Sequence, residues 1–129
     1  MYWKNEEHKR RYMMFSVLTG KIKLDCEYGS ALYLLAAITS KNAILVSQFI
    51  DDEGIDFVEL QESSKEWSRS EKAMIQLAAN LFTAGYIEAD VYSSFYTLDP
   101  ENTKVALQAL SIRFTAKSRN LEIQMEIEV

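Results

Sequence analysis

The chain has 129 residues, of which 48% are hydrophobic and 26% charged, a composition typical of one folded domain. Its formal net charge of −5 argues against a general nucleic-acid binder, because a phosphate backbone repels an acidic surface. The longest apolar run, residues 31–38, is much shorter than the roughly 20 residues that span a membrane. The first residues lack the apolar stretch of a secretory signal and the single cysteine cannot form an internal disulfide, so we expect a cytoplasmic protein.

Charge is unevenly distributed along the chain. Residues 1–23 carry six basic and two acidic side chains, whereas the remainder carries eight basic and seventeen acidic ones. Residues 51–62 are the most acidic stretch and contain no Lys or Arg. We expect both segments to be solvated faces. The alternative is that they meet, either within one chain or between subunits.

The first half of the chain predicts three helices. A helix over residues 5–19 carries an apolar stripe at three- and four-residue spacing and ends at Gly20, where a left-handed cap is favoured. Asp25 is suited to cap a second helix over residues 26–39, which is apolar nearly all round and is therefore expected at the centre of the fold. A third, shorter helix is predicted over about 40–50, although its β-branched residues would also suit a strand.

The middle of the chain contains the strongest local signal. Gly54 predicts a break, and a short helical turn is expected over residues 55–60. Ser68 with Glu71 three residues later forms a capping-box pattern, in which each side chain satisfies a free backbone N–H at the start of a helix. This helix has a clear apolar face and is predicted to stop by Gly85.

The spacing of the apolar residues changes in the last part of the chain. Residues 86–98 are aromatic and β-branched and predict either a short hairpin or an irregular helical turn. Asp99, followed by proline, caps a last helix that runs to Phe114. Within residues 117–129, apolar side chains alternate with Glu and Gln, as in a half-buried strand, which is either paired or a loose tail. The sequence thus predicts a mainly α fold: a helical domain of five or six helices over residues 1–116 with a strand-like C-terminal tail.

Few residues are suited to catalysis or metal binding. The four glycines are too far apart for a phosphate-binding loop, and no nucleophile turn or cysteine pair is present. His8, the single histidine, is expected to be an interfacial or solvent-facing ring rather than a general base, and Cys26 to be structural. The acidic residues that begin at Asp51 lack the glycine spacing of a calcium loop. We therefore predict no cofactor and no metal, and we expect binding rather than catalysis.

A pattern of packing residues runs through the chain: Trp67, the runs 77–82 and 109–114, and Tyr33 followed by two leucines. It resembles an uncharacterised family of small bacterial and phage-associated helical proteins of unknown function. In that family a tryptophan precedes a Leu-Ala-x-Asn-Leu helix, and a helix ending in Arg and an aromatic residue closes the domain. The resemblance implies a helical fold and brings no activity, cofactor or catalytic residue with it.

Asn80 and Arg113 are the polar members of this pattern and lie on otherwise apolar helices. We expect both to be structural groups that hydrogen-bond loop carbonyls and join two helices. The alternative is an exposed arginine that binds an acidic partner. Together with Trp67, they are the candidate interaction or structural residues of a small accessory module. This module is predicted to bind an unidentified protein or a second copy of itself.

A winged-helix protein that binds nucleic acid is the alternative function. The helix over 68–84, followed by the aromatic segment 86–98, has the order of a recognition helix and a wing. Arg69 and Lys72 lie near the start of this helix, but two glutamates balance them, which is poor equipment for phosphate contacts. Nucleic acid is therefore not the expected partner.

Overall fold

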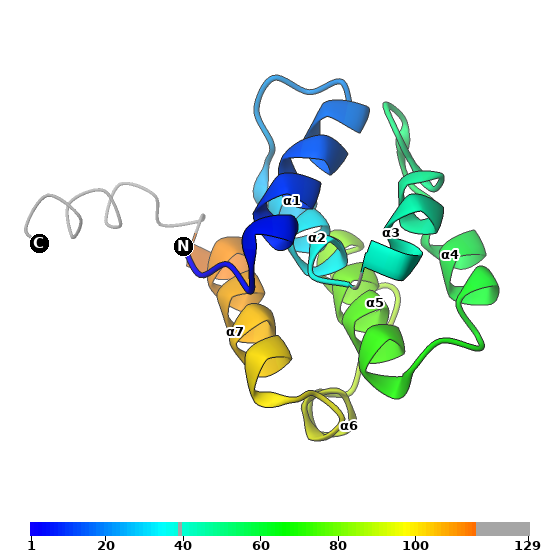
Figure 1. Ribbon diagram of the computed structural model, residues 1–129, viewed down its shortest axis with the longest axis vertical. Coiled ribbons are helices and arrows are strands. Elements are labelled where there is room, and N and C mark those ends of the chain that lie inside the picture. Colours follow the sequence, from blue (N-terminus) through cyan, green and yellow to red (C-terminus); the bar gives the residue numbers. More distant parts are fainter. Residues whose placement is uncertain (39, 116–129) are drawn as a thin grey trace, which may run out of the picture.

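The computed structural model describes residues 1–38 and 40–115, which form a bundle of helices (Figure 1). The predicted mainly α fold is confirmed. The elements in chain order are α1 (Glu6–Leu18), α2 (Cys26–Ala36), α3 (Ser40–Ser47), β1 (Ile50–Asp51), β2 (Gly54–Ile55), α4 (Phe57–Ser63), α5 (Arg69–Phe82), α6 (Val91–Tyr96) and α7 (Pro100–Thr115). The described residues thus form seven helices rather than five or six, because α6 occupies the segment for which a hairpin was the other prediction. The predicted strand within 117–129 lies outside the described residues.

The helix α2 forms the centre of the bundle, as predicted. Every residue from Gly29 to Ile38 is buried, and α2 packs against α1, α5 and α7 (Figure 1). A helix that is apolar all round gains hydrophobic free energy only when neighbours cover all of its sides. The arrangement therefore follows from the composition of α2. No helix in residues 1–38 and 40–115 has both the length and the apolar character to cross a membrane.

The predicted helix caps are present. Asp25 accepts a hydrogen bond from the backbone N–H of Tyr28 at 2.9 Å, and Asp99 accepts one from Asn102 at 2.7 Å. Ser68 and its partner Glu71 form the complete capping box at the start of α5. These side chains satisfy N–H groups that have no acceptor within their own helix. Local sequence thus fixes where α2, α5 and α7 begin.

Removing the cap of α5 should cost measurable stability. The Ser68→Ala variant is expected to lose about 1 kcal/mol of unfolding free energy, because an N–H in the first turn of α5 loses its acceptor. Urea unfolding followed by circular dichroism measures this change. The exposed Ser63, at the end of α4, is the matched control, and Ser63→Ala should leave the midpoint unchanged. Equal midpoints for the two variants would show that the capping box contributes nothing.

A short hairpin interrupts the helices where the sequence predicted a longer third helix and an early fourth. Ile50 pairs with Ile55 in antiparallel register, and both side chains are buried. The Asp51 side chain accepts hydrogen bonds from two N–H groups of the turn, and Gly54 adopts a positive φ of 151°. Asp56 then caps α4. The predicted helices over 40–50 and 55–60 therefore had wrong boundaries, since α3 ends at Ser47 and α4 begins at Phe57. The reason is that backbone groups of the turn have hydrogen-bond partners that a helix would not give them.

The basic and acidic segments lie next to each other in the fold. A Cβ added to Gly20, just after α1, would come within 3.6 Å of the Asp52 Cβ in the hairpin. The Lys21 ammonium lies 4.8 Å from the centre of the Tyr28 ring. Burial, with the nearby charges of Asp25 and Asp51, raises the pKa of Tyr28. Across residues 1–38 and 40–115, no ion pair joins the 1–23 segment to the 51–62 segment.

Candidate functional site

The structure brings two of the predicted residues to one cavity. A cavity of about 290 Å³ lies between the C-terminal ends of α5 and α7. Its lining consists of Asn80, Leu81, Ala84, Gly85, Arg113 and Phe114. Ala84 and Gly85 both have positive φ angles, 54° and 90°, so the chain turns sharply as it leaves α5. This turn leaves room for the side chains of Asn80 and Arg113.

Arg113 joins three helices. Its Nε–H donates a hydrogen bond to the Leu81 carbonyl near the end of α5, at 3.0 Å. In the first turn of α2, one Nη donates to the Cys26 Sγ at 3.4 Å, and the other lies 3.4 Å from the Glu27 Oε1. A cation near the C-terminal end of a helix also interacts favourably with the helix dipole. Since all three nitrogens have partners inside the protein, this geometry is that of a structural arginine.

Asn80 ties a loop to its helix. Its Nδ2 donates a hydrogen bond to the Ile87 carbonyl at 3.0 Å, and the side chain is only partly buried. Thr83 adds a second tie, because its Oγ1 accepts the N–H of Ile87 at 3.0 Å. Residue 87 is thus held at both of its backbone polar groups. Asn80 therefore sets the path of the chain between α5 and α6.

Trp67, the third predicted residue, lies apart from the other two. It is partly buried against the core just before Ser68, the residue that caps α5. Asn80 lies near the other end of this 14-residue helix, which at 1.5 Å per residue is about 20 Å long. The structure therefore does not bring Trp67 into the cavity between α5 and α7.

A cluster of side chains that the sequence did not single out caps the C-terminal end of α2. His8 Nε2 donates to the Tyr33 carbonyl at 2.8 Å, and Arg11 Nε donates to the Ala36 carbonyl at 2.8 Å. The Lys4 ammonium lies 3.5 Å from the Ala37 carbonyl. The last carbonyls of a helix have no hydrogen-bond partner within the helix, and a cation beside them interacts favourably with the negative end of the helix dipole. The signal in the sequence was the spacing of four and three residues that puts Lys4, His8 and Arg11 on one side of the chain.

His8 is buried in the core, so its prediction as an interfacial or solvent-facing ring was wrong. The Lys4 backbone N–H donates to its Nδ1 at 3.1 Å, which assigns the proton to Nε2. Burial above all, together with the charges of Arg11 and Lys4 and against the opposing hydrogen bond to Tyr33, lowers the pKa of His8 to about 4. The ring is neutral at pH 7 and both nitrogens are engaged. This geometry gives it no free position for general base catalysis.

Aromatic rings enclose His8. The Trp3 ring centre lies 5.1 Å from the imidazole in an edge arrangement, and the Tyr33 ring centre lies at 4.6 Å. The Tyr33 hydroxyl donates a hydrogen bond to the Tyr2 carbonyl, and burial raises the pKa of this hydroxyl. The cluster therefore locks the N-terminal segment onto α2. It is a packing unit.

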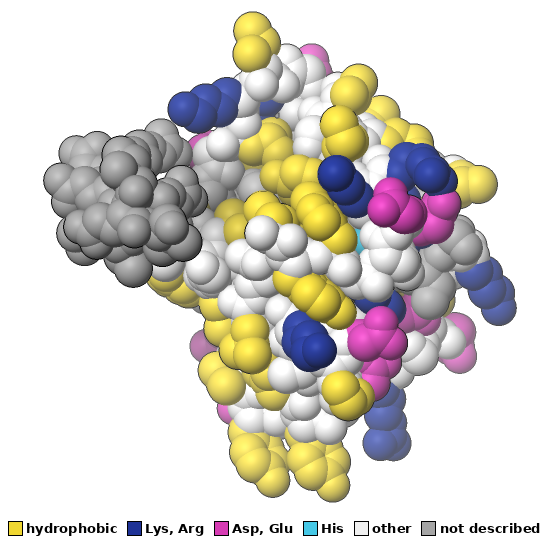
Figure 2. All heavy atoms as spheres, turned by 60° about the vertical axis from the view of Figure 1, so that its left-hand side comes forward, with side chains coloured by type: hydrophobic (Ala, Val, Ile, Leu, Met, Phe, Trp, Pro, Cys, Tyr) yellow, Lys and Arg dark blue, Asp and Glu magenta, His cyan; other side chains and the backbone are white. Residues whose placement is uncertain are grey.

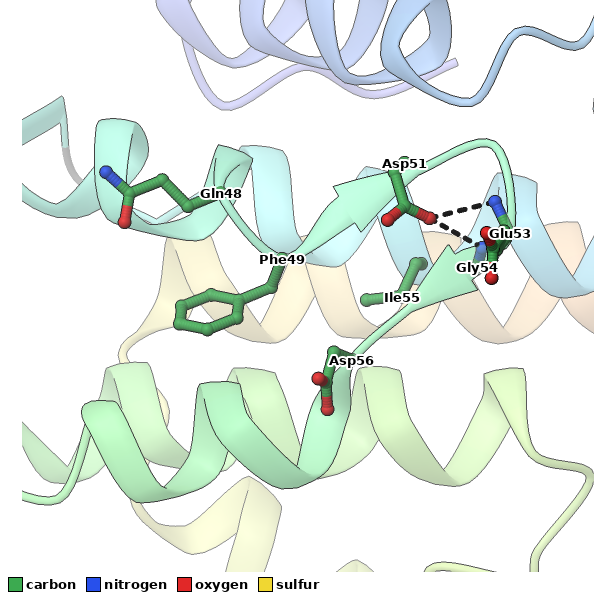
Figure 3. A pocket seen from close by; sticks show the side chains of 7 residues that line it. All are labelled: Gln48, Phe49, Asp51, Glu53, Gly54, Ile55 and Asp56. Carbon is green, nitrogen blue, oxygen red and sulfur yellow. Dashed lines mark hydrogen bonds between the residues drawn. The ribbon is translucent and has the colours of Figure 1, made fainter.

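The acidic hairpin forms a shallow cavity of about 320 Å³ beside α3 (Figure 3). The Asp51 carboxylate points back to the turn and accepts the N–H groups of Glu53 and Gly54, at 2.8 and 3.2 Å. The Asp56 carboxylate accepts the N–H of Glu59 at 3.1 Å. Both carboxylates thus serve local structure. In residues 1–38 and 40–115, no group of three or more His, Cys, Asp and Glu side chains could hold a metal ion.

Tyrosines are exposed around α6. Tyr86, Tyr92 and Tyr96 expose 89%, 76% and 78% of their surface, and Val91 is exposed beside them. We call these four residues the tyrosine surface. The rings of Tyr92 and Tyr96 stack with their centres 5.9 Å apart and their planes at 20°. In Figure 2, hydrophobic side chains project at the lower end of the molecule, where Figure 1 places α6.

The geometry of α5 and α6 does not support the winged-helix alternative. A recognition helix needs an exposed face that can enter a DNA groove. The buried residues of α5 are Met74, Ile75, Leu77, Ala78, Ala79 and Leu81. Its neighbours α2, α4, α6 and α7 cover it from several sides. The segment that would form the wing contains α6 rather than a hairpin.

Comparisons of the chain with protein-family models, with curated proteins and with solved structures find no match. The resemblance to a family of small helical proteins therefore stays a prediction.

Proposed function

We propose that the chain is a cytoplasmic protein-interaction module without catalysis, which binds a protein partner through the tyrosine surface. The observation that carries this proposal is the exposure of three tyrosine rings over one short segment, residues 86–96. Exposed apolar side chains such as the stacked rings of Tyr92 and Tyr96 are typical of interaction sites in soluble proteins. The buried and engaged state of His8 supports a binding role over a catalytic one.

Tyrosine is the residue type that best suits such a surface. Its ring supplies a large apolar area at a low cost in side-chain entropy, and its hydroxyl can still hydrogen-bond at the edge of a contact. Tyr and Trp are enriched among the residues that contribute most to protein binding. Stacking of Tyr92 on Tyr96 restricts both rings before any partner arrives. The free energy lost in ordering them on binding is correspondingly smaller.

The segment that carries the tyrosines is fixed to the core. Gln76 donates a hydrogen bond from its amide to the Glu88 carbonyl, and Asn80 donates one to the Ile87 carbonyl at 3.0 Å. The Asp90 side chain accepts a backbone N–H in the first turn of α6 at 2.8 Å and so caps this helix. Two side chains of α5 thus hold the chain just before α6. On this proposal, Asn80 positions the binding surface without touching the partner.

The tyrosine surface is tested by substitution. The source organism's lysate is passed over the immobilised full chain, a protein that it retains is purified, and its affinity is measured by calorimetry. Tyr92→Ser is expected to weaken the affinity about 30-fold, the equivalent of about 2 kcal/mol, because a central tyrosine loses its buried contact area. Ile44 is equally exposed on α3, and Ile44→Ser should leave the affinity within twofold of the wild type.

Other outcomes would contradict the proposal. An affinity that falls equally in both variants, or in neither, would remove the tyrosine surface from the contact. A retained molecule that proves to be nucleic acid, with a mobility shift that weakens steeply with salt, would instead favour the winged-helix alternative. Concentration-dependent sedimentation of the purified chain, abolished by Tyr92→Ser, would identify a second copy as the partner.

A further inference from the structure

A second exposed apolar surface lies on α1, on a different part of the chain from the tyrosine surface. Met13 and Val17 expose 61% and 77% of their surface. The residues of this α1 face are Met13, Met14, Val17, Leu18 and Ile22. Figure 2 shows hydrophobic side chains gathered on the upper half of the molecule, at the height of α1, with both basic and acidic side chains around them. An exposed apolar surface of this kind is typical of a binding site.

The charges around the α1 face select an acidic occupant. Exposed basic residues along α1 and just beyond its end outnumber the exposed Glu6 and Glu7 of the same helix: Lys9, Arg10, Lys21 and Lys23. Opposite charges at the rim of a contact steer the partner and fix its register. A neutral or basic apolar segment would bury the same area without these attractions. The occupant should therefore combine apolar residues with carboxylates.

One segment of the chain has this composition. Residues 121–129 alternate Leu, Ile, Met, Ile and Val with Glu, Gln, Glu and Glu, and they contain no Lys or Arg. In an extended segment, every second side chain points the same way, so one side is apolar and the other is acidic. We propose that residues 121–129 dock on the α1 face of the same chain, with their apolar side chains over Met13, Met14 and Val17.

The repeat distance of side chains in an extended segment 121–129 is close to that of the exposed residues on α1. Side chains on one side of an extended segment repeat every 6.7 Å or so. Exposed residues four apart on a helix, such as Met13 and Val17 or Met14 and Leu18, repeat about every 6 Å along its axis. Successive apolar side chains of the segment can therefore lie between successive apolar side chains of α1. The match holds over the two to three repeats that the α1 face provides.

The last described helix, α7, and α1 both pack against α2. Ile112 on α7 and Tyr12 on α1 converge on Gly29: a Cβ there would lie 3.4 Å from the Ile112 Cγ2 and 3.9 Å from the Tyr12 hydroxyl. Side chains from the last turn of α7 and from the middle of α1 thus meet at the same residue of α2. Residues 116–120 can span up to about 17 Å when extended. A linker this short also gives the segment a high effective concentration at its site.

Electrostatics disfavour the other obvious position for this segment. The two-stranded hairpin has free edges to which an extended segment could add. Its turn, however, carries Asp51, Asp52 and Glu53. Like charges placed opposite each other on neighbouring strands are destabilising. The carboxylates of residues 121–129 should therefore avoid pairing along the hairpin, and on α1 they should favour the part near Lys9 over the end at Gly20, which lies beside Asp52.

Photo-crosslinking in the full chain tests the proposal. A benzophenone amino acid replaces Val17, whose exposed side chain leaves room for it, and the crosslinked peptides are identified by mass spectrometry after irradiation at low micromolar concentration. The expected product joins position 17 to residues 121–129 in a species with the mass of one chain. The same probe at Ile44, equally exposed on α3, is the control and should not reach this segment.

Charge reversal makes the test specific. The triple variant Glu122→Lys, Glu126→Lys, Glu128→Lys should lower the yield of this crosslink roughly fivefold or more at low salt, and 0.5 M NaCl should lower the wild-type yield in the same direction. An unchanged yield in the triple variant would overturn the proposal, as would no crosslink to residues 121–129. A product with the mass of two chains would show that a second copy occupies the face, and would overturn it also. None of these outcomes depends on the tyrosine surface.

Discussion

The Arg113→Ala variant is expected to lose about 3 kcal/mol of unfolding free energy and about 10 °C in thermal midpoint. The substitution leaves the Leu81 carbonyl without its donor and takes the cation away from Glu27. It also opens space beside the first turn of α2, where Cys26 accepts a hydrogen bond from the guanidinium. Unfolding in urea at pH 7, followed by circular dichroism, measures the loss.

Two other variants show whether this loss arises from burial. Arg10→Ala removes an exposed arginine that pairs with the exposed Glu7, and it should change stability by less than about 0.5 kcal/mol. Asn80→Ala removes one hydrogen bond of a partly exposed amide and should cost about 1 kcal/mol. An unchanged midpoint for Arg113→Ala would contradict the structural role and would favour an arginine that binds an acidic partner.

Acid is expected to destabilise the protein through His8. The pKa of this ring is about 4 in the folded state and 6.5 in its ordinary state, so between these values the unfolded chain binds a proton that the folded chain does not. The contribution of neutral His8 is therefore fully present above pH 6.5 and is lost as the pH falls towards 4. The loss at pH 4 amounts to roughly 3 kcal/mol. Protonation would place an Nδ1–H against the Lys4 N–H and add a cation beside Arg11.

Comparison with His8→Gln isolates this contribution, because carboxylates also titrate below pH 5. Unfolding free energies of both proteins are measured every half unit from pH 4.5 to 7.5. The wild-type curve should fall more steeply than that of His8→Gln between pH 6.5 and 4.5, and the two should run parallel above pH 7. Parallel curves over the whole range would contradict the low pKa. His8 is the single histidine, so its imidazole resonances give an independent titration by NMR.

Local signals in the sequence predicted much of the fold. The caps at Asp25, Ser68 and Asp99 were predicted correctly because a cap and its N–H partner are only two or three residues apart. The hairpin at 50–55 was missed because strands of two residues are too short to show an alternation, and their β-branched and acidic neighbours also fit a helical turn.

The candidate site was predictable only in part. Asn80 and Arg113 stood out as polar residues on apolar helices, and the structure places both at one cavity. The cluster of Lys4, His8 and Arg11 was not singled out, since charged residues at this spacing are equally typical of a solvated helix face. The tyrosine surface was also missed, because aromatic residues in a short segment predict burial as readily as exposure.

The mainly α class, the starts of α2, α5 and α7 and the central place of α2 were determined by the sequence alone, because capping and apolar periodicity act over a few residues. Only the tertiary structure decided which polar side chains serve the core. His8 meets the Tyr33 carbonyl across 25 residues, and Arg113 meets the Leu81 carbonyl across 32. Such partners come together only after the helices have packed, and burial then makes an unpaired polar group costly. The same packing left the tyrosines of α6 exposed, where a partner can reach them.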